Sequence, residues 1–373
     1  MRRTLLILWC AVMVLPVASA QDPIGEVSYV EGYPELVRDG DVLLDTIDFG
    51  FEVENYDSIR TVDGSFVEIQ IDPSTGIDAS ISVQPDSAFC FDITSLRGEQ
   101  VGAIEMITGT IDVVARRLIG NSGLEVRTAS AVMGVRGTVF SVTTAIDGDI
   151  LVTAEEGEVE VTVDEGETAA VEPGTAVEFD PSERRIRLLR YSPGQLRAFR
   201  EAWLGDRARI FIQRAPELVV SYGRLYLEAR DRFTENYADL MSYREVLDRW
   251  VDEGRRGLRI PLGTRLEQGS TLIGTLARAR TSMLVLERLT AQLERMSPYV
   301  AAIASEIQVT DDVSGLDLFR LVRRDQRIMR ERIAAARQAL KLFTLRNAGI
   351  APRLLGDETG EDSESAGNAT DDE

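Results

Sequence analysis

The sequence predicts a multi-domain protein, in which an all-β domain is followed by an all-α helical bundle and a disordered acidic tail. Three observations support this order. Short alternating apolar runs separated by turn residues fill the first half, a helical apolar period begins near Ser192, and the last residues contain no apolar side chain larger than alanine. We therefore divide the chain into residues 1–20, 21–191, 192–355 and 356–373.

Residues 1–20 have the three-part form of a secretory signal peptide. Arg2 and Arg3 precede an apolar run from Leu5 to Val17, and small residues follow up to Ala20. The run is shorter than the ~20 residues of a membrane-spanning helix. We therefore expect cleavage after Ala20, no membrane-spanning segment in the mature chain, and a location in the periplasm, at the cell surface or outside the cell.

Composition limits the chemistry that the protein can perform. The sequence contains no histidine, which excludes histidine-dependent nucleophiles, histidine metal clusters and imidazole pH switches. Cys10 belongs to the expected signal peptide, so Cys90 has no cysteine partner in the mature chain. Because Phe89 and Phe91 flank Cys90, we predict a buried, inert thiol. We predict a protein that is not an enzyme and needs no cofactor.

Charge is distributed unevenly along the chain, whose formal net charge is −21. Residues 21–190 carry 34 acidic and 11 basic side chains, whereas residues 191–356 carry 20 acidic and 28 basic ones. This asymmetry indicates two chemically different domains. An acidic first half argues against nucleic acid as a partner, because phosphate binding requires a basic surface.

Residues 25–189 show the two-residue period of β-strands. Val67, Ile69 and Ile71 alternate with polar residues, and so do Val159, Val161 and Val163. Strands that recur every ~8 to 12 residues predict an all-β domain, which could close as a sandwich, a barrel or a solenoid.

Residues 124–142 are the most specific stretch of this half, because they join two alternating runs through a tight corner. Glycine suits positions with positive φ or close backbone approach, and an arginine can donate to several carbonyls. We predict that Arg136→Ala lowers the free energy of unfolding by ~1 to 3 kcal/mol. The structural motif comprises Thr128, Gly134, Arg136, Gly137, Thr138 and Phe140.

These residues make the segment from about residue 25 to 180 resemble the FecR family, the periplasmic domain of bacterial iron-transport regulators. Further matching pieces are Gly25-Glu26-Val27 and Asp57-Ser58-Ile59-Arg60-Thr61 followed by Gly64-Ser65. The resemblance implies a solenoid-like stack of short strands and no active site. The regulators carry a sigma-factor-binding segment and one membrane helix before this domain, whereas here a signal peptide precedes it.

From Ser192 onward the apolar period is helical. The sequence predicts one stripe from Leu196 to Trp250 with a break or kink at Pro216, a second that ends before Ser297-Pro298, and a third from Leu316 to Phe343. We expect an antiparallel bundle of three to five helices with coiled-coil character. An aromatic series could stack sugars, but its helical spacing is more typical of a core: Trp203, Tyr222, Tyr226, Phe233, Tyr237, Tyr243 and Trp250.

Acidic pairs offer two candidate chemistries. The pairs Asp39/Asp41, Glu155/Glu156 and Asp311/Asp312 could support glycoside hydrolysis, although acidic clusters more often mark turns. Asp39-Gly40-Asp41 and Asp147-Gly148-Asp149 could hold Ca²⁺, but neither has the spacing of a twelve-residue calcium loop.

A basic face in the third helical segment is the candidate interaction surface, formed by Arg323, Arg324, Arg327 and Arg330. It could be a solvated face, a surface that docks on the acidic β domain, or a site for an anionic envelope polymer. The leading hypothesis is an exported interaction or scaffold module that binds an envelope protein or a polysaccharide such as peptidoglycan. The alternative is sensory signalling through a membrane partner, and a carboxylate-based glycoside hydrolase is third. The sequence does not define the oligomeric state.

Overall fold

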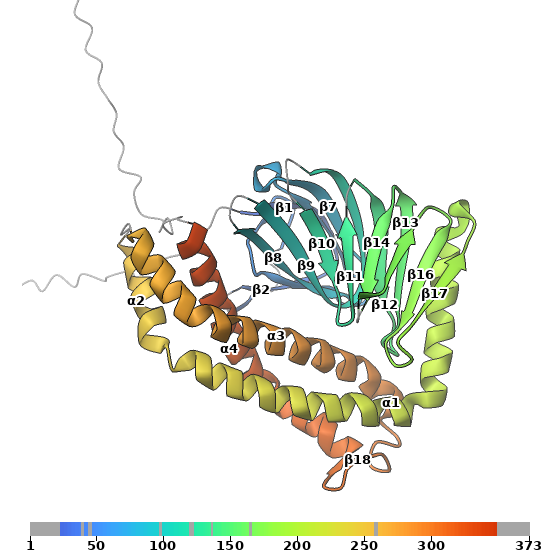
Figure 1. The fold of residues 1–373 in the computed structure, drawn as a ribbon. Helices are drawn as coiled ribbons and strands as arrows, with labels where there is room; N and C mark the ends of the chain where they lie inside the picture. The colour runs from blue at the N-terminus through green and yellow to red at the C-terminus, as the bar shows by residue number, and fades with distance from the viewer. Residues whose placement is uncertain are drawn as a thin grey trace, which may run out of the picture.

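The computed structural model describes residues 23–348, with gaps at 39–40, 44–46, 97–98, 119–122, 136, 164–165 and 257–259. The predicted signal peptide and acidic tail lie outside the described residues. Strands occupy the first part of the chain and helices the second (Figure 1), which confirms the predicted order of a large β-rich part followed by a helical region.

The β-rich part consists of short strands joined by tight turns, apart from one strand of 20 residues. The strands are β1 (Gly25–Glu31), β2 (Glu35–Arg38), β3 (Asp41–Leu43), β4 (Glu52–Val53), β5 (Ser58–Arg60), β6 (Phe66–Ile71), β7 (Ile77–Val83), β8 (Ala88–Leu96), β9 (Glu99–Leu118), β10 (Gly123–Arg127), β11 (Ala131–Val135), β12 (Val139–Thr144), β13 (Ile150–Glu156), β14 (Val159–Val163), β15 (Thr168–Val171), β16 (Thr175–Asp180) and β17 (Arg185–Arg190).

The strands form two layers that share β9. One layer runs β4-β1-β6-β7-β9-β12-β13-β16-β17. The other runs β3-β2-β5-β8-β9-β10-β11-β14-β15, with β9 and β10 parallel and the other pairs antiparallel. The solenoid-like stack is not confirmed. Alternating sequences allow both arrangements, because period two fixes which face is dry and not how the strands are ordered.

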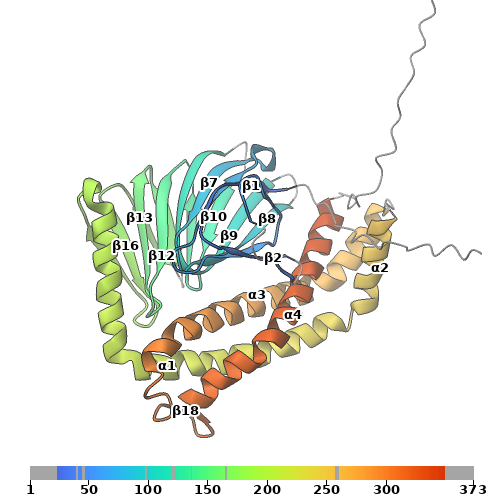
Figure 2. The same cartoon turned by 180° about the vertical axis from the view of Figure 1, so that it is seen from behind.

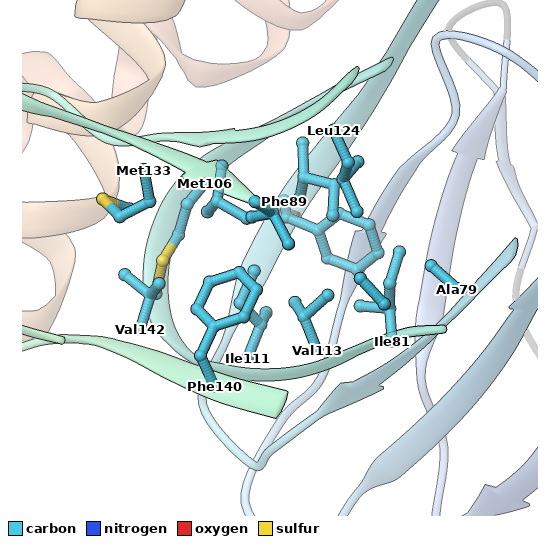
Figure 3. Close-up of a cluster of buried hydrophobic side chains, with 14 of the residues drawn as sticks. Ala79, Ile81, Phe89, Met106, Ile111, Val113, Leu124, Met133, Phe140 and Val142 are labelled. Carbon is cyan, nitrogen blue, oxygen red and sulfur yellow. The ribbon is translucent and has the colours of Figure 1, made fainter. Parts of the chain in front are cut away.

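The core of the β-rich part lies between the two layers. Phe89 and Leu124 reach into it from one layer, and Val113 and Phe140 from the other (Figure 3). Each of these side chains is at least 98% buried. Full burial of an aliphatic or phenylalanine side chain contributes roughly 1.5 to 3 kcal/mol, so the alternating pattern accounts for much of the stability.

The helical region contains α1 (Leu196–Met241), α2 (Arg244–Arg255), α3 (Leu262–Val300) and α4 (Gly315–Ala348). A small hairpin, β18 (Gln308–Thr310) and β19 (Val313–Ser314), joins α3 to α4. The predicted aromatic series lies in or against the buried clusters of this region, with Phe233 fully buried. Figure 2 shows α4 crossing α1 and α3, with its red end beside α2.

Two prolines lie inside helices. Helix α1 is continuous through Pro216 and bends visibly (Figures 1 and 2), in agreement with the expected kink. The prediction that the second stripe ends before Ser297-Pro298 is wrong, because α3 includes Pro298 and ends at Val300. A proline this close to the end of a helix disrupts few backbone hydrogen bonds, so the last turn survives. No helix among the described residues is apolar over a length that could cross a membrane.

Candidate functional site

The predicted structural motif contains two corners. The first joins β10 to β11, where Thr128 Oγ1 accepts a hydrogen bond from Ala131 N at 3.0 Å. The second leads from β11 in one layer to β12 in the other, and Gly137 there has a φ of +67°. Gly134 is exposed in β11, whereas Thr138 and Phe140 are buried. Arg136 lies outside the described residues, so its carbonyl contacts remain a prediction.

Helix α3 is attached to the β-rich part by arginines. Arg280 Nε donates to Asp92 Oδ2 at 2.7 Å, and its Nη2 pairs with Glu105. Arg288 Nη2 donates to the other oxygen of Glu105 at 2.9 Å, while its Nε donates to Met106 O at 3.0 Å. Arg127 Nη1 also lies 3.4 Å from Glu105 Oε1, and Glu105 is only 3% exposed, so three guanidinium groups surround a buried carboxylate.

The same face of α3 continues to Arg295. Arg295 Nη1 donates to Thr108 Oγ1 at 2.7 Å and to Thr144 O at 3.2 Å. Arg280, Arg288 and Arg295 are spaced by about two helical turns, which places them in one row. Sequence reasoning did not select these three arginines, although this spacing within an apolar helix was a visible signal. Docking of the helices on the acidic β-rich part therefore uses α3.

Helix α4 contacts the β-rich part through its last turns. Lys341 Nζ lies 2.9 Å from Glu54 Oε2, and Tyr56 OH lies 3.1 Å from Thr344 Oγ1. Arg38 Nη1 lies 2.9 Å from the other oxygen of Glu54. The loop after β4 is thus held by a lysine from α4 and an arginine from β2.

Helix α1 brings one arginine into a cluster of buried acids. Arg207 Nη1 lies 2.5 Å from Asp149 Oδ2, 3.3 Å from Glu178 Oε1 and 3.8 Å from Asp147 Oδ2. Burial, followed by the charges of Asp147 and Asp180, raises the pKa of Asp149 to about 7. Burial and repulsion among the carboxylates together thus exceed the effect of the single guanidinium on the pKa of Asp149.

This cluster contains the second calcium candidate, Asp147-Gly148-Asp149, which is occupied by a guanidinium. Tyr222 OH also donates to Asp147 O at 3.1 Å. Within the described ranges, no group of three or more acidic or cysteine side chains is arranged to hold a metal ion. Asp39 and Gly40 of the first calcium candidate lie outside those ranges.

The predicted interaction face lies on the solvent side of α4. Arg323, Arg324, Arg327 and Arg330 are all exposed. Arg323 donates to Phe319 O and Arg324 to Asp325 Oδ1. Among the described residues, neither Arg327 nor Arg330 has a hydrogen-bond or ion-pair partner.

A groove of about 240 Å³ lies between the strands and the helices. Its wall on the β side comes mainly from β2, β5 and the β7–β8 turn, and its other wall comes from α3 and α4. Two ion pairs line it, Arg337 Nη2 with Glu287 at 2.8 Å and Arg60 Nη2 with Glu294 at 3.3 Å.

The candidate hydrolytic pairs are not in the groove. Glu155, Glu156, Asp311 and Asp312 are exposed at other positions, and so is Asp41. Their surroundings match those of acidic turn residues in solvent.

The fold and these contacts define a class of two-part protein, in which a helical region is fastened by arginine–carboxylate contacts to a two-layer β domain. Residues 57–190, which lie within the β-rich part and its strands up to Arg190, match the model of the family described as FecR protein. The match confirms the resemblance seen in the sequence. A search among curated proteins found no match.

Two crystal structures of a candidate anti-sigma factor from Parabacteroides distasonis ATCC 8503 are similar to parts of the chain. The first, at 1.65 Å resolution, has 15% sequence identity, a TM-score of 0.33, and coverage of 38% of this chain and 63% of that chain. The second, at 2.50 Å resolution, has 17% identity, a TM-score of 0.26, and coverage of 44% and 63%. The chain therefore spans less than two thirds of the length of these relatives.

Proposed function

We propose that this is a non-enzymatic, envelope-associated protein whose FecR domain and helices form an interaction module in a regulatory or scaffolding assembly. The FecR match supports the envelope association and the regulatory role. The single observation that supports binding is the exposed face of α4, where Arg323 and Arg327 lie one turn apart without a carboxylate partner among the described residues. Exposed arginines in this arrangement can bind carboxylates or phosphates of a partner with both members of the guanidinium fork.

The partner that we favour is an anionic envelope polymer such as peptidoglycan. The decisive experiment is co-sedimentation of the protein with purified peptidoglycan at low and moderate salt. The variant Arg323→Gln/Arg327→Gln should lose most of the retention, and salt should weaken the binding of the unmodified protein. A matched control is Arg197→Gln/Arg209→Gln, which removes two exposed arginines of α1 that already pair with Glu201 and Asp206. Equal loss in both variants, or salt-independent retention, would contradict this site.

The second candidate function is signalling through a membrane partner, which the FecR match favours. In this case the partner is a protein, and a pull-down against solubilised envelope proteins should retain one specific protein while peptidoglycan retains none of the chain. Retention by the polymer alone would argue against signalling as the main role.

A further inference from the structure

The groove between the strands and the helices combines an apolar lining with unusual cations. Val37, Ala88 and Ile107 line it from the β side. Helix α4 contributes Val322, Met329 and Ile333, whose spacing of seven and four residues places them on one face of the helix. The apolar part of a ligand can therefore contact both walls of the groove at once.

Two guanidinium groups in this lining lack a carboxylate. Arg330 has no polar partner among the described residues, and Arg295 bonds only to the neutral oxygens of Thr108 and Thr144. A third, Arg337, is 7% exposed and uses only Nη2 to bond Glu287, while its buried Nε has no acceptor. Buried donors without acceptors are uncommon in folded proteins, and Arg337 Nε is the one such donor among the described residues that line the groove.

The lining holds four acidic and four basic side chains, so the arginines without an ion pair distinguish the groove, and not its net charge. Glu287 and Glu294 are already paired with Arg337 and Arg60. The remaining acids are Glu35, which is half-buried, and Asp86, which is exposed and whose charge acts on Arg295 without a direct contact.

We propose that this groove binds a free carboxylic acid with one alkyl chain. The alkyl chain lies between the apolar side chains of α4 and the β wall, and the carboxylate pairs with Arg330 and Arg295. The volume of about 240 Å³ is below the ~300 to 1,000 Å³ of typical drug-sized sites, which favours a medium chain over a long one. Arg330 lies at the exposed edge of the groove, whereas Arg295 is partly buried, and a guanidinium shielded from water binds a carboxylate more strongly than one in open solvent.

The proposal is tested by calorimetric titration of the full chain with decanoate below its micelle concentration. Decanoate should bind with a single site, and octanoate should bind about tenfold more weakly because fewer methylene groups are buried. Decanol and decyltrimethylammonium should each bind at least about tenfold more weakly than decanoate, because neither supplies a carboxylate. Equal binding of all three decyl compounds would overturn the proposal, and so would the absence of decanoate binding.

Matched variants locate the carboxylate. Arg330→Gln should weaken decanoate binding about tenfold, whereas Arg327→Gln, which alters an exposed arginine outside the groove, should leave it unchanged. Because Arg295→Gln could disturb the attachment of α3, the Arg330 variant decides the outcome. Equal weakening in both variants would show that the acid binds the basic surface and not the groove. The peptidoglycan co-sedimentation uses Arg323 and Arg327, whereas the decanoate titration uses Arg330, so the proposed function and the proposed groove ligand can fail separately.

Discussion

The Nζ atom of Lys341 in α4 lies 2.9 Å from Oε2 of Glu54, a residue 287 positions earlier in the chain. Both residues are more than 90% buried, and Lys341 is the only lysine of the sequence. Glu54 also forms an ion pair with Arg38, so one carboxylate pairs with a cation from the β-rich part and with a cation from the helices.

Removal of the shared carboxylate should cost more stability than removal of the lysine. Glu54→Gln removes a buried carboxylate that contacts two cations, of which Arg38 also pairs with Asp57, and should lower the free energy of unfolding by about 3 kcal/mol. Lys341→Met leaves Glu54 with Arg38 and should lower it by about 1 kcal/mol. Urea unfolding measures both values. In the more exposed pair of Arg60 and Glu294, Glu294→Gln should change stability by less than about 1 kcal/mol. A loss in Glu54→Gln no greater than in Glu294→Gln would refute the shared-carboxylate account.

The acidic cluster at Arg207 should make stability depend on pH. The pKa of Asp149 is about 7 in the folded protein, against an ordinary value near 3.8, so the folded state binds a proton that the unfolded state releases. The stability that protonation of Asp149 contributes is fully present below about pH 4 and is lost as the pH rises through 7. Besides Arg207, the carboxylates of Asp147, Asp180 and Glu178 and the hydroxyl of Tyr222 face this region.

The variant Asp149→Asn removes the titrating group. Between pH 5 and pH 8, the free energy of unfolding should fall less in Asp149→Asn than in the unmodified protein, by on the order of 2 kcal/mol. Denaturant unfolding at several pH values measures this. The exposed residue Asp63 provides the control, since Asp63→Asn should keep the original slope. Parallel curves for Asp149→Asn and the unmodified protein would show that Asp149 does not titrate in this range.

Gly148 should be more sensitive to substitution than a glycine of similar backbone conformation. Gly148 has a φ of +98°, and an added Cβ would lie 1.8 Å from Tyr222 Oη. Gly64 has a φ of +72°, but no atom lies within 4 Å of its added Cβ. Gly64→Ala should cost about 1 kcal/mol from backbone strain alone, whereas Gly148→Ala should cost about 3 kcal/mol because Tyr222 must move.

Thermal unfolding compares these variants. The double variant Gly148→Ala/Tyr222→Phe should recover part of the loss, because the hydroxyl that clashes is absent. Additive effects of the two substitutions would indicate that Tyr222 does not cause the difference.

The thiol of Cys90 should be unreactive in the folded protein. Cys90 is 3% exposed, and burial raises its pKa to about 12. In a Cys10→Ser variant, Cys90 carries the one remaining thiol. This thiol should therefore react with an aromatic disulfide reagent at pH 8 no faster than the protein unfolds, and it should react completely in denaturant. Fast labelling under native conditions would contradict the burial of this side chain.

Local features of the fold could be predicted from the sequence because they depend on neighbouring residues. The alternation at Val159, Val161 and Val163 predicted a strand with a buried face, and the structure shows β14 there. The aromatic spacing of α1 predicted a core, and Phe233 is fully buried. The phenylalanines beside Cys90 predicted its burial.

The arrangement of distant elements could not be predicted from these patterns. No period in the sequence shows that β11 and β12 belong to different layers, or that β9 pairs in both. Nor does a charge pattern reveal that Glu105 pairs with Arg280 and Arg288, which are more than 170 residues away. The groove depends on the same long-range placement: the sequence singled out Arg330, Tyr226 and the stretch from Ser58 to Thr61, but no pattern brought them together.

The 20-residue strand β9 connects both layers of the β-rich part and helix α3. Its first half pairs with β8 and β10, its second half with β7 and β12, and α3 contacts its middle at Glu105, Met106 and Thr108. Neither layer can open fully while β9 stays paired in the other, and α3 loses these arginine contacts when β9 leaves. Amide protons of β8 and of β12 should therefore share one slowest exchange rate, set by a global opening and not by separate local ones.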